Sequence, residues 1–528
     1  MSVLKQNAKV AVIGSGISGL SFAYYLSKLR PDVKVSVFEA TDRVGGYIRT
    51  TKHSQSGLML EKGPRTLRGA SVGTLLIIDT ILKLGRQKEL MGVHKNSLSS
   101  KRYLLSNNKS EPLMALPTTL KESLRFLKDD LAKGMIPGIM AEPFKPKEHH
   151  EYDTESVSEF MERRFGSWSS NLISAVCHGV FAGSSKELGV DSFLPALAKL
   201  ERDYGSVLGG LLRRSDGSTP NEQKELLSKY SELFGVEIDF TNLVKFLKDY
   251  PMVVFGAGLN SLPDIIYEDL LKHSPNVKFQ FKKYISSVQK EGDRVIVDER
   301  NSFDHVKSTI NVHRLSNILN NQNLKPLLNQ ITYSSVALVN VYIPSHNYLK
   351  DTPGFGYLVP LALQNDEKLL GVIFDSCNEA SSRRLFEPAV LHDLKSGIVT
   401  PDQSKSAQSE GDYTKVTLMF GGHFYNETGF PTKDQLISSV ERVLQRDLKI
   451  DLEAVRKSTI EIELIEDGIP QYNVGYQMLK SKIILKMKDE YGHRLSLGGM
   501  ALGDGIGVPD CYLNGFKSAL ELSGVNEK

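Results

Sequence analysis

Residues 8–39 carry a complete β-α-β pattern around a glycine-rich turn. A predicted apolar strand at residues 10–13 runs directly into Gly14, Ser15, Gly16, Ile17, Ser18 and Gly19. A helical pattern follows, and a second strand with alternating valines ends at Glu39. Such glycines allow a tight turn and a close approach to a pyrophosphate, while the acidic residue accepts hydrogen bonds from ribose hydroxyls. The pattern therefore predicts a parallel, Rossmann-like sheet with a dinucleotide at the N-terminus of the first helix.

A second glycine pair after Glu39 indicates which dinucleotide binds. Arg43, Val44, Gly45 and Gly46 follow directly, and an NAD enzyme needs no glycine pair at this place. Flavoproteins that resemble monoamine oxidase do have an arginine and a glycine pair there, where the chain crosses an extended FAD. We therefore predict FAD rather than NAD or NADP.

Composition argues against several other kinds of protein. A net charge of +3 in 528 residues gives no basis for a nucleic-acid partner. Cys177, Cys377 and Cys511 are far apart and the histidines form no clustered motif, so neither a disulfide framework nor a metal site is expected. No apolar run reaches the length of about 18 residues that predicts a membrane-spanning helix. Because the first strand begins near Lys9, we expect neither a secretory peptide nor an ordinary transit peptide.

The middle of the chain is predicted to change from helices to strands. Leucine spacing predicts one helix over residues 120–131, ending before Gly134. The apolar residues 135–140 are predicted to form a short turn. From Tyr250 onwards strands alternate with glycine-rich turns, and a last helix is expected from Pro509.

Several longer motifs agree with one family. LEKGPRTLRG at residues 60–69, GFGYLVP at 354–360 and LLGVIFDS at 369–376 are its more specific motifs, and GGMALGDGIGVPDCYLNGF covers residues 498–516. On these motifs the chain resembles the protoporphyrinogen oxidases, in particular the fungal mitochondrial type, over nearly its whole length. Pro509 departs from the family, in which Asn is more frequent, but proline suits the first turn of a helix.

The resemblance implies an α/β fold with interleaved domains. These are an FAD-binding, Rossmann-like domain of the amine oxidase type, an α+β substrate domain and a mostly helical membrane-binding region. The expected segments are, for the FAD-binding domain, 1–95, 250–312 and 476–528; for the substrate domain, 96–118 and 313–475; for the membrane-binding region, 119–212; and for a connecting loop and helix, 213–249.

The matching motifs also imply a set of FAD contacts. The attachment is expected to be non-covalent, because no cysteine lies between Cys377 and Cys511, where monoamine oxidases attach their flavin. The implied contacts are the six residues Gly14 to Gly19 and Glu39, together with Ala40, Arg43, Gly46, Tyr47, Gly63, Pro64, Arg65, Thr66, Ile285, Ala501, Ile506, Gly507 and Val508.

The implied substrate is an apolar tetrapyrrole with two propionates. The resemblance places Arg102 at a propionate, and Leu358 and Met419 on either side of the ring. It implies the oxygen-dependent, six-electron oxidation of protoporphyrinogen IX to protoporphyrin IX with formation of hydrogen peroxide, the penultimate step of haem synthesis. The flavin performs the difficult chemistry in such an enzyme, so no side chain is predicted to be a catalytic acid or base.

The resemblance further implies a place in the cell. Family members are monotopic proteins of the inner mitochondrial membrane, on its intermembrane-space side. The candidate patch for membrane binding is the helix after residue 119 with the apolar residues 135–140, flanked by Lys121, Arg125, Lys128 and Lys133. Transfer of the product to ferrochelatase and formation of a homodimer are further expectations.

Two alternatives share this fold. A flavin amine oxidase or a carotenoid-type desaturase would have the same nucleotide motifs, but LEKGPRTLRG and GFGYLVP favour the porphyrinogen enzyme. A lipid carrier resembling the Rab GDP-dissociation inhibitors would bind no FAD, and the intact glycines together with Glu39 and Arg43 argue against it.

Overall fold

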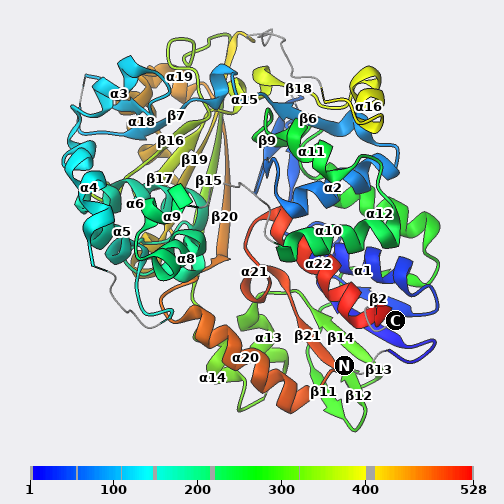
Figure 1. The fold of residues 1–528 in the computed structure, drawn as a ribbon. Coiled ribbons are helices and arrows are strands. Elements are labelled where there is room, and N and C mark those ends of the chain that lie inside the picture. The colour runs from blue at the N-terminus through cyan, green and yellow to red at the C-terminus, as the bar shows by residue number, and fades with distance from the viewer. Residues whose placement is uncertain are drawn as a thin grey trace.

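The protein consists of two lobes (Figure 1). The nucleotide lobe, at the right and bottom of Figure 1, contains both ends of the chain and a five-stranded sheet, and the second lobe, at the left, contains a seven-stranded sheet. The computed structural model describes residues 4–54, 57–108, 110–146, 152–213, 221–319, 321–399 and 411–525.

The five-stranded sheet collects strands from distant parts of the chain. The last four residues of its central strand are all buried apolar residues, as expected for a strand that is covered on both faces. All strand pairs are parallel, so the predicted Rossmann-like sheet is confirmed. The order is β10 (Val277–Gln280), β2 (Lys34–Phe38), β1 (Lys9–Ile13), β14 (His305–Ser308) and β21 (Leu495–Leu497).

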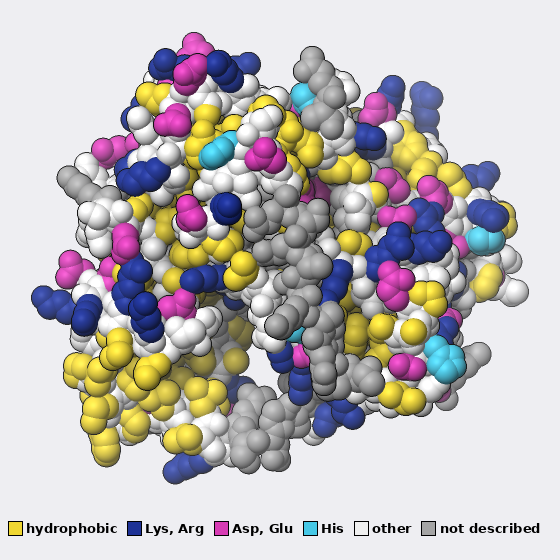
Figure 2. Space-filling view, turned by 90° about the horizontal axis from the view of Figure 1, so that it is seen from above, with side chains coloured by type: hydrophobic (Ala, Val, Ile, Leu, Met, Phe, Trp, Pro, Cys, Tyr) yellow, Lys and Arg dark blue, Asp and Glu magenta, His cyan; other side chains and the backbone are white. Residues whose placement is uncertain are grey.

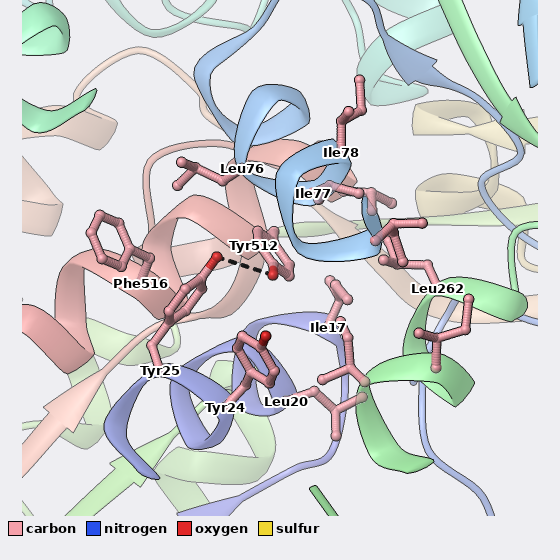
Figure 3. Close-up of a cluster of buried hydrophobic side chains, with 14 of the residues drawn as sticks. Ile17, Leu20, Tyr24, Tyr25, Leu76, Ile77, Ile78, Leu262, Tyr512 and Phe516 are labelled. Atoms are coloured by element: carbon pink, nitrogen blue, oxygen red, sulfur yellow. Dashed lines mark hydrogen bonds between the residues drawn. The ribbon is translucent and has the colours of Figure 1, made fainter. Parts of the chain in front are cut away.

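The first and last helices of the nucleotide lobe share one core. Helices α1 (Ile17–Leu29) and α22 (Val508–Ser523) pack against each other beside the sheet. Figure 3 shows Tyr25 of α1 next to Tyr512 and Phe516 of α22, with a hydrogen bond of 3.1 Å between the two tyrosine hydroxyls. The C-terminal helix therefore completes the domain that the N-terminal segment begins.

The second lobe is built on a mixed seven-stranded sheet. One of its faces packs on α18 (Lys433–Leu448) through apolar residues such as Val339 and Leu418. The opposite face is partly covered by α6 (Ser167–Phe181), which contacts β16 and β17. The strand order is β20 (Thr459–Pro470), β15 (Tyr333–Pro344), β19 (Tyr413–Gly422), β17 (Leu369–Ile373), β16 (Gly356–Leu358), β7 (Arg102–Leu105) and β8 (Leu113–Ala115).

The helix predicted over residues 120–131 is shorter than expected. Helix α3 covers only Leu120–Phe126. Asp129 starts a separate 3-10 turn, because its side chain accepts the N–H of Leu131 at 3.0 Å. The prediction was wrong in length because a local side-chain hydrogen bond replaced the continued helical bond.

The apolar residues 135–140 form a helix and not the predicted turn. They belong to α4 (Met135–Ala141), in which Pro137 lies in the first turn, where its missing N–H has no helical partner to lose. The other helices of this region are η3 (Asp130–Ala132), η4 (Glu142–Phe144), α5 (Val157–Phe165), α7 (Val190–Phe193), α8 (Pro195–Tyr204) and α9 (Val207–Arg213).

The remaining elements flank the two large sheets. Residues 382–395, which lie within the expected substrate segment 313–475, pack with Leu385, Phe386 and Leu394 in the core of the nucleotide lobe. The small sheets are β18 (Ser382–Arg384), β6 (Leu90–Val93), β9 (Met252–Phe255) and β5 (Leu67–Arg68); β11 (Val288–Glu291), β12 (Arg294–Val297) and β13 (Asn301–Phe303); and β3 (Thr50–Lys52) with β4 (Met59–Glu61). The helices are α2 (Val72–Lys83), η1 (Gln87–Glu89), η2 (Leu98–Ser100), α10 (Asn221–Phe234), α11 (Phe240–Leu247), α12 (Ser261–His273), α13 (Val312–Leu319), α14 (Lys325–Leu328), α15 (Asp375–Ser381), α16 (Pro388–Lys395), α17 (His423–Thr428), α19 (Leu452–Arg456), α20 (Tyr476–Tyr491) and α21 (Gly499–Leu502).

The close packing of α1 on α22 predicts that Gly515→Ala destabilises the protein. An added Cβ at residue 515 would lie 2.7 Å from the backbone N of Phe22 and 2.7 Å from the backbone O of Ser18, so the helices would have to separate. Overpacking of this kind costs about 1–3 kcal/mol, and we expect a lower melting temperature in a thermal scan. In the control Gly256→Ala the nearest atom is Cγ of Met91 at 3.5 Å. Equal melting temperatures for the two variants would contradict the packing argument.

Candidate functional site

The carboxyl ends of β1, β14 and β21 define one edge of the nucleotide lobe. β2 and β10 lie on one side of β1, and β14 and β21 lie on the other. Open parallel sheets bind ligands at such a switch point. Gly14, Thr309 and Gly498 follow the three strands, and each donates its N–H to the last carbonyl of a neighbouring strand at 2.9–3.0 Å. These turns are therefore fixed to the sheet and to each other.

Glycines make a cradle without side chains at this edge. Gly16 and Gly45 form a parallel bridge, and the N–H of Gly45 donates to the carbonyl of Ser15 at 2.9 Å. An added Cβ at Gly46, which has φ +60°, would lie 3.1 Å from Cα of Gly16. At Gly16 the nearest atom to an added Cβ is 4.0 Å away, so this side of the turn faces open space. A pyrophosphate fits such a backbone cradle at the first turn of a helix.

Glu39 is held by the glycine turn and by the residues that follow it. Its carboxylate accepts hydrogen bonds of 2.7–3.0 Å from the N–H and the hydroxyl of both Ser15 and Thr41. Burial alone would raise the pKa of this carboxyl, but the hydrogen bonds lower the pKa below its usual value. Glu39 is therefore a fixed anion, of the kind that accepts hydrogen bonds from ribose hydroxyls.

Arg43 fastens the second glycine turn. Its guanidinium donates to the carbonyl oxygens of Val44 and Ile48 at 3.0 Å and to that of Gly46 at 2.6 Å. The structure thus places this predicted FAD residue in the wall of the cradle, where it binds backbone groups of its own turn.

Arg65 joins the cradle to the second lobe. It donates to the carboxylate of Asp375 at 2.6 Å, and the two side chains are only 10% and 9% exposed. Asp375 also accepts the hydroxyl of Thr417, in β19, at 2.6 Å. In the same segment an added Cβ at Gly63 would lie 2.0 Å from the carbonyl oxygen of Tyr47. The predicted FAD segment 63–66 therefore lies between the crossing turn and the second sheet.

The C-terminal segment closes the cradle from the opposite side. Gly499 donates its N–H to the hydroxyl of Ser18 at 3.2 Å, which brings α21 to the first turn of α1. Ala501 is buried in α21. Gly507, between Ile506 and Val508, is the N-cap of α22, and a helix N-terminus favours negative charge beside it.

The predicted FAD contacts Ile285 and Ala40 lie close to Glu39, at the carboxyl edge of the parallel sheet. Lys283 donates its N–H to the carbonyl of Glu39 at 2.9 Å. The buried Ile285 follows two residues later, and Ala40 is exposed next to Glu39. The residues present at this edge therefore fit an extended dinucleotide, from Ile285 through the glycine cradle to the N-terminus of α22.

The three predicted substrate residues lie on one face of the seven-stranded sheet. The register pairs Leu358 with Gly371 and Gly371 with Met419. It also pairs Arg102 with Gly356, two residues before Leu358. Cross-strand partners and residues two apart on a strand share a face. An added Cβ at Gly371 would lie 2.8 Å from Cδ2 of Leu358, so this glycine leaves room for the leucine.

Helix α6 forms a wall above this face. Its Gly179 allows contact with Leu358, since an added Cβ would lie 2.8 Å from the leucine Cδ2. Val176 and Val180 on the same helix are 39% and 48% exposed, and Figure 2 shows the surface hollowed between the two lobes. Arg102 is exposed, and among the residues that the structure describes no ion-pair partner is found for it. An anionic, apolar molecule would find one cation and an apolar wall here.

Sequence reasoning missed two groups that shape the site. One is Asp375, the partner of Arg65, which nothing in the sequence connects to residue 65. The other is the pair Tyr472 and Tyr476, whose hydroxyls donate to the carbonyls of Met500 and Ala501. No sequence signal connects these tyrosines to residues 500 and 501, because Tyr472 lies before α20 and Tyr476 is its first residue.

Comparison with known proteins identifies the family. The model of the flavin-containing amine oxidoreductases matches residues 17–395. Protoporphyrinogen oxidase of Saccharomyces cerevisiae is 34% identical over 554 residues, which cover 99% of each chain. That of Schizosaccharomyces pombe is 29% identical over 98% of this chain and 99% of the relative. The chain belongs to the protoporphyrinogen oxidase family.

A solved structure shows the same fold. The crystal structure of a candidate protoporphyrinogen oxidase from Exiguobacterium sp. 255-15 matches with a TM-score of 0.69 and 18% identity, over 99% of this chain and 100% of that one. The predicted family, the FAD-binding fold of the amine oxidase type and FAD as the cofactor are therefore confirmed, and the membrane-binding region stays a prediction. The non-covalent attachment and the individual contacts remain predictions.

The cradle predicts that Gly16→Val folds but binds FAD more than about tenfold more weakly, because the new side chain fills the space of the pyrophosphate. Glu39→Ala should also lose FAD, since it removes the ribose acceptor. Gly19→Ala is the contrasting variant, because its Cβ would lie 2.1 Å from the carbonyl oxygen of Gly14 and should lower the melting temperature of the apoprotein. Flavin content and apoprotein melting separate the two effects. Full flavin content in Gly16→Val would contradict the assignment.

The buried ion pair predicts that Arg65→Gln and Asp375→Asn each lower the free energy of unfolding by about 3 kcal/mol, because one charge is left without its partner. The double variant should cost less than the sum of the two. Denaturant unfolding of all three variants measures the coupling. If Arg65 binds FAD and not Asp375, the two losses will add and only Arg65→Gln will lower flavin content.

Proposed function

We propose that this chain oxidises protoporphyrinogen IX to protoporphyrin IX, with FAD and dioxygen, and forms hydrogen peroxide. The observation that carries the proposal is the common sheet face of Arg102, Leu358 and Met419. Thr417, two residues before Met419 on the same face, reaches Arg65 of the FAD segment through Asp375. The proposed substrate face therefore adjoins the proposed flavin site.

The side chains of this chain would bind and orient the substrate. Arg102 would pair with a propionate, and Leu358, Met419 and the exposed valines of α6 would hold the ring and exclude water. When bound, FAD supplies the hydride acceptor and passes the electrons to dioxygen. Orientation alone gives large rate enhancements when reacting atoms are held close together, so the proposal assigns no acid or base.

The direct test follows porphyrin fluorescence after the purified holoprotein is mixed with protoporphyrinogen in air. We expect the fluorescence and hydrogen peroxide to appear together, and both to depend on bound FAD, with Gly16→Val as the inactive control. An amine oxidase is the alternative with the same fold. Peroxide formation from amines, with no porphyrin formed above the rate without enzyme, would favour that alternative and overturn the proposal.

Arg102→Ala should raise KM more than it lowers kcat. A propionate contact far from the reacting carbons binds the ground state and the transition state about equally. Loss of a charged hydrogen bond of about 1.5–3 kcal/mol predicts a rise in KM of about ten- to hundredfold, and Arg102→Lys should retain part of the binding. Steady-state kinetics with unchanged KM in Arg102→Ala would remove this residue from the substrate site.

We infer that an exposed apolar patch on the second lobe is the membrane-binding surface. It comprises Ile136, Ile139 and Met140 of α4, Phe144 of η4, and Leu211 and Leu212 of α9, which are 38–88% exposed. Hydrophobic side chains gather at the lower left of Figure 2, on the side of these helices. Large exposed apolar patches mark sites of interaction with proteins or membranes.

A buried carboxylate holds this patch in shape. Glu142, which follows α4 directly, is fully buried and pairs with the buried Arg164. It also accepts the hydroxyl of Ser206 at 2.7 Å and the N–H of Val207 at 2.8 Å, at the start of α9. Such support keeps α4 and α9 together although their apolar sides face solvent.

The residues around the patch favour binding to a membrane surface without crossing the membrane. Lys121, Arg125, Lys128 and Lys133 are all exposed nearby in the sequence and would meet anionic headgroups. In the part of the chain that the structure describes, no helix combines the length and the hydrophobicity needed to cross a membrane. We propose the inner mitochondrial membrane, on its intermembrane-space side, as the location. Transfer of the product to ferrochelatase and a homodimer stay predictions.

Replacing Ile136, Ile139 and Met140 together by Ser should reduce binding to anionic phospholipid vesicles at least about tenfold, because each buried apolar side chain contributes about 1.5–3 kcal/mol. Flavin content and melting temperature should not change, since these side chains are exposed. The matched control replaces Ile484 and Leu485 of α20, which are 49% and 63% exposed. Co-sedimentation in which the triple variant and the control bind alike would place the membrane surface elsewhere.

A further inference from the structure

Three side chains at intervals of four residues hold the segment that carries the proposed FAD contacts Ala501, Ile506, Gly507 and Val508. Tyr472, Tyr476 and Lys480 donate to the carbonyl oxygens of Met500, Ala501 and Gly503, respectively. Tyr476 and Lys480 lie one turn apart on α20, and Tyr472 lies just before this helix, with its ring stacked on that of Tyr476.

The carbonyls that receive these bonds need partners from outside their own helix. Helix α21 has only four residues, so most of its carbonyls have no intrahelical donor. The rings of Tyr472 and Tyr476 stack with centroids 4.1 Å apart and planes 14° apart, and both tyrosines are buried. Stacking limits the ring rotation that would move the hydroxyls away from their acceptors.

The base of α20 is itself anchored in the helical region of the second lobe. Gly475 and Met478 donate their N–H groups to the backbone oxygen and to a carboxylate oxygen of Asp153 at 2.9 and 3.0 Å. The side chain of Gln477 donates to the hydroxyl of Ser192 at 3.0 Å. Helix α20 therefore connects α7 and the segment before α5 to the C-terminal edge of the nucleotide cradle.

We propose that Tyr472, Tyr476 and Lys480 are positioning residues that fix residues 499–508 for the reaction. The proposal rests on the proposed function, because Ala501 and Val508 are its FAD contacts. The hydrogen bonds of the three donors go to backbone carbonyls. They act by holding the backbone against which the flavin would lie, and misplacement of reacting groups by about 1 Å can cost about a hundredfold in rate.

The test compares Tyr476→Phe and Lys480→Met with Tyr491→Phe and Lys482→Met, which remove the same groups elsewhere on α20. The first readout is hydrogen–deuterium exchange of the peptide 498–508 in the apoprotein. We expect about three- to tenfold faster exchange in the first pair than in the second, as the loss of one hydrogen bond predicts. The apoprotein measurement does not depend on the substrate or on FAD.

The second readout is the bound flavin. In Tyr476→Phe we expect near-stoichiometric FAD, a shifted visible spectrum, and kcat lowered about three- to tenfold with little change in KM. Lys480→Arg should restore the wild-type spectrum and rate, because it keeps a donor at this position. Exchange, spectrum and kcat equal to those of the two controls would overturn the positioning role.

The two proposals can fail separately. Faster exchange at residues 498–508 with an unchanged flavin spectrum would show that the three hydrogen bonds hold this segment but do not affect the bound flavin. This result would overturn the positioning role alone. If the wild-type holoprotein forms no porphyrin but the exchange result is as expected, the proposed function is overturned. The conclusion that Tyr472, Tyr476 and Lys480 hold residues 498–508 would then still stand.

Discussion

The contact between two glycine turns at the carboxyl edge of the parallel sheet is the constraint on which the site depends. Gly16 and Gly45 meet backbone to backbone, and side chains at this place would occupy the space proposed for the pyrophosphate. The surrounding groups hold the two turns in place by hydrogen bonds. Glu39 accepts hydrogen bonds from the first turn, Arg43 satisfies the carbonyls of the second, and Gly499 binds the first turn of α1. Each of these groups is polar, and each has its partner within the cradle.

The second lobe contributes the sheet face that carries Arg102, Leu358 and Met419. The interface between the two lobes determines where this face lies relative to the nucleotide cradle. Arg65 leaves the cradle to bind Asp375, and through this carboxylate it reaches Thr417 in the seven-stranded sheet. A buried ion pair contributes little net stability, but breaking it is costly because one charge is left without its partner, so the arrangement of the lobes that keeps this pair is favoured. At the other end of the site, hydrogen bonds from Tyr472, Tyr476 and Lys480 fix residues 500–503 beside α20. Both connections join groups that are more than twenty residues apart in sequence.

Sequence alone predicted what depends on local patterns. One short segment contains the β-α-β unit, Glu39 and the second glycine pair. Its alternating apolar residues favour strands, and its glycines allow the tight turns between them. The limits of α3 and α4 were missed because one side-chain bond at Asp129 and one tolerated proline decided them. The pairs Arg65–Asp375 and Tyr476–Ala501 were not predictable, since they form only after distant strands have found their register. Arg102, Leu358 and Met419 came from the family resemblance, and the structure adds that they share one sheet face.

Anaerobic mixing of the holoprotein with protoporphyrinogen tests most directly that the substrate face adjoins the flavin. In the absence of dioxygen each protein molecule can accept one pair of electrons, so the visible absorbance of the bound flavin should bleach in a single phase whose rate rises with porphyrinogen concentration. Readmission of air should restore the absorbance and allow porphyrin to accumulate. Porphyrin formation while the flavin stays oxidised, or a flavin that porphyrinogen leaves unbleached, would contradict the account.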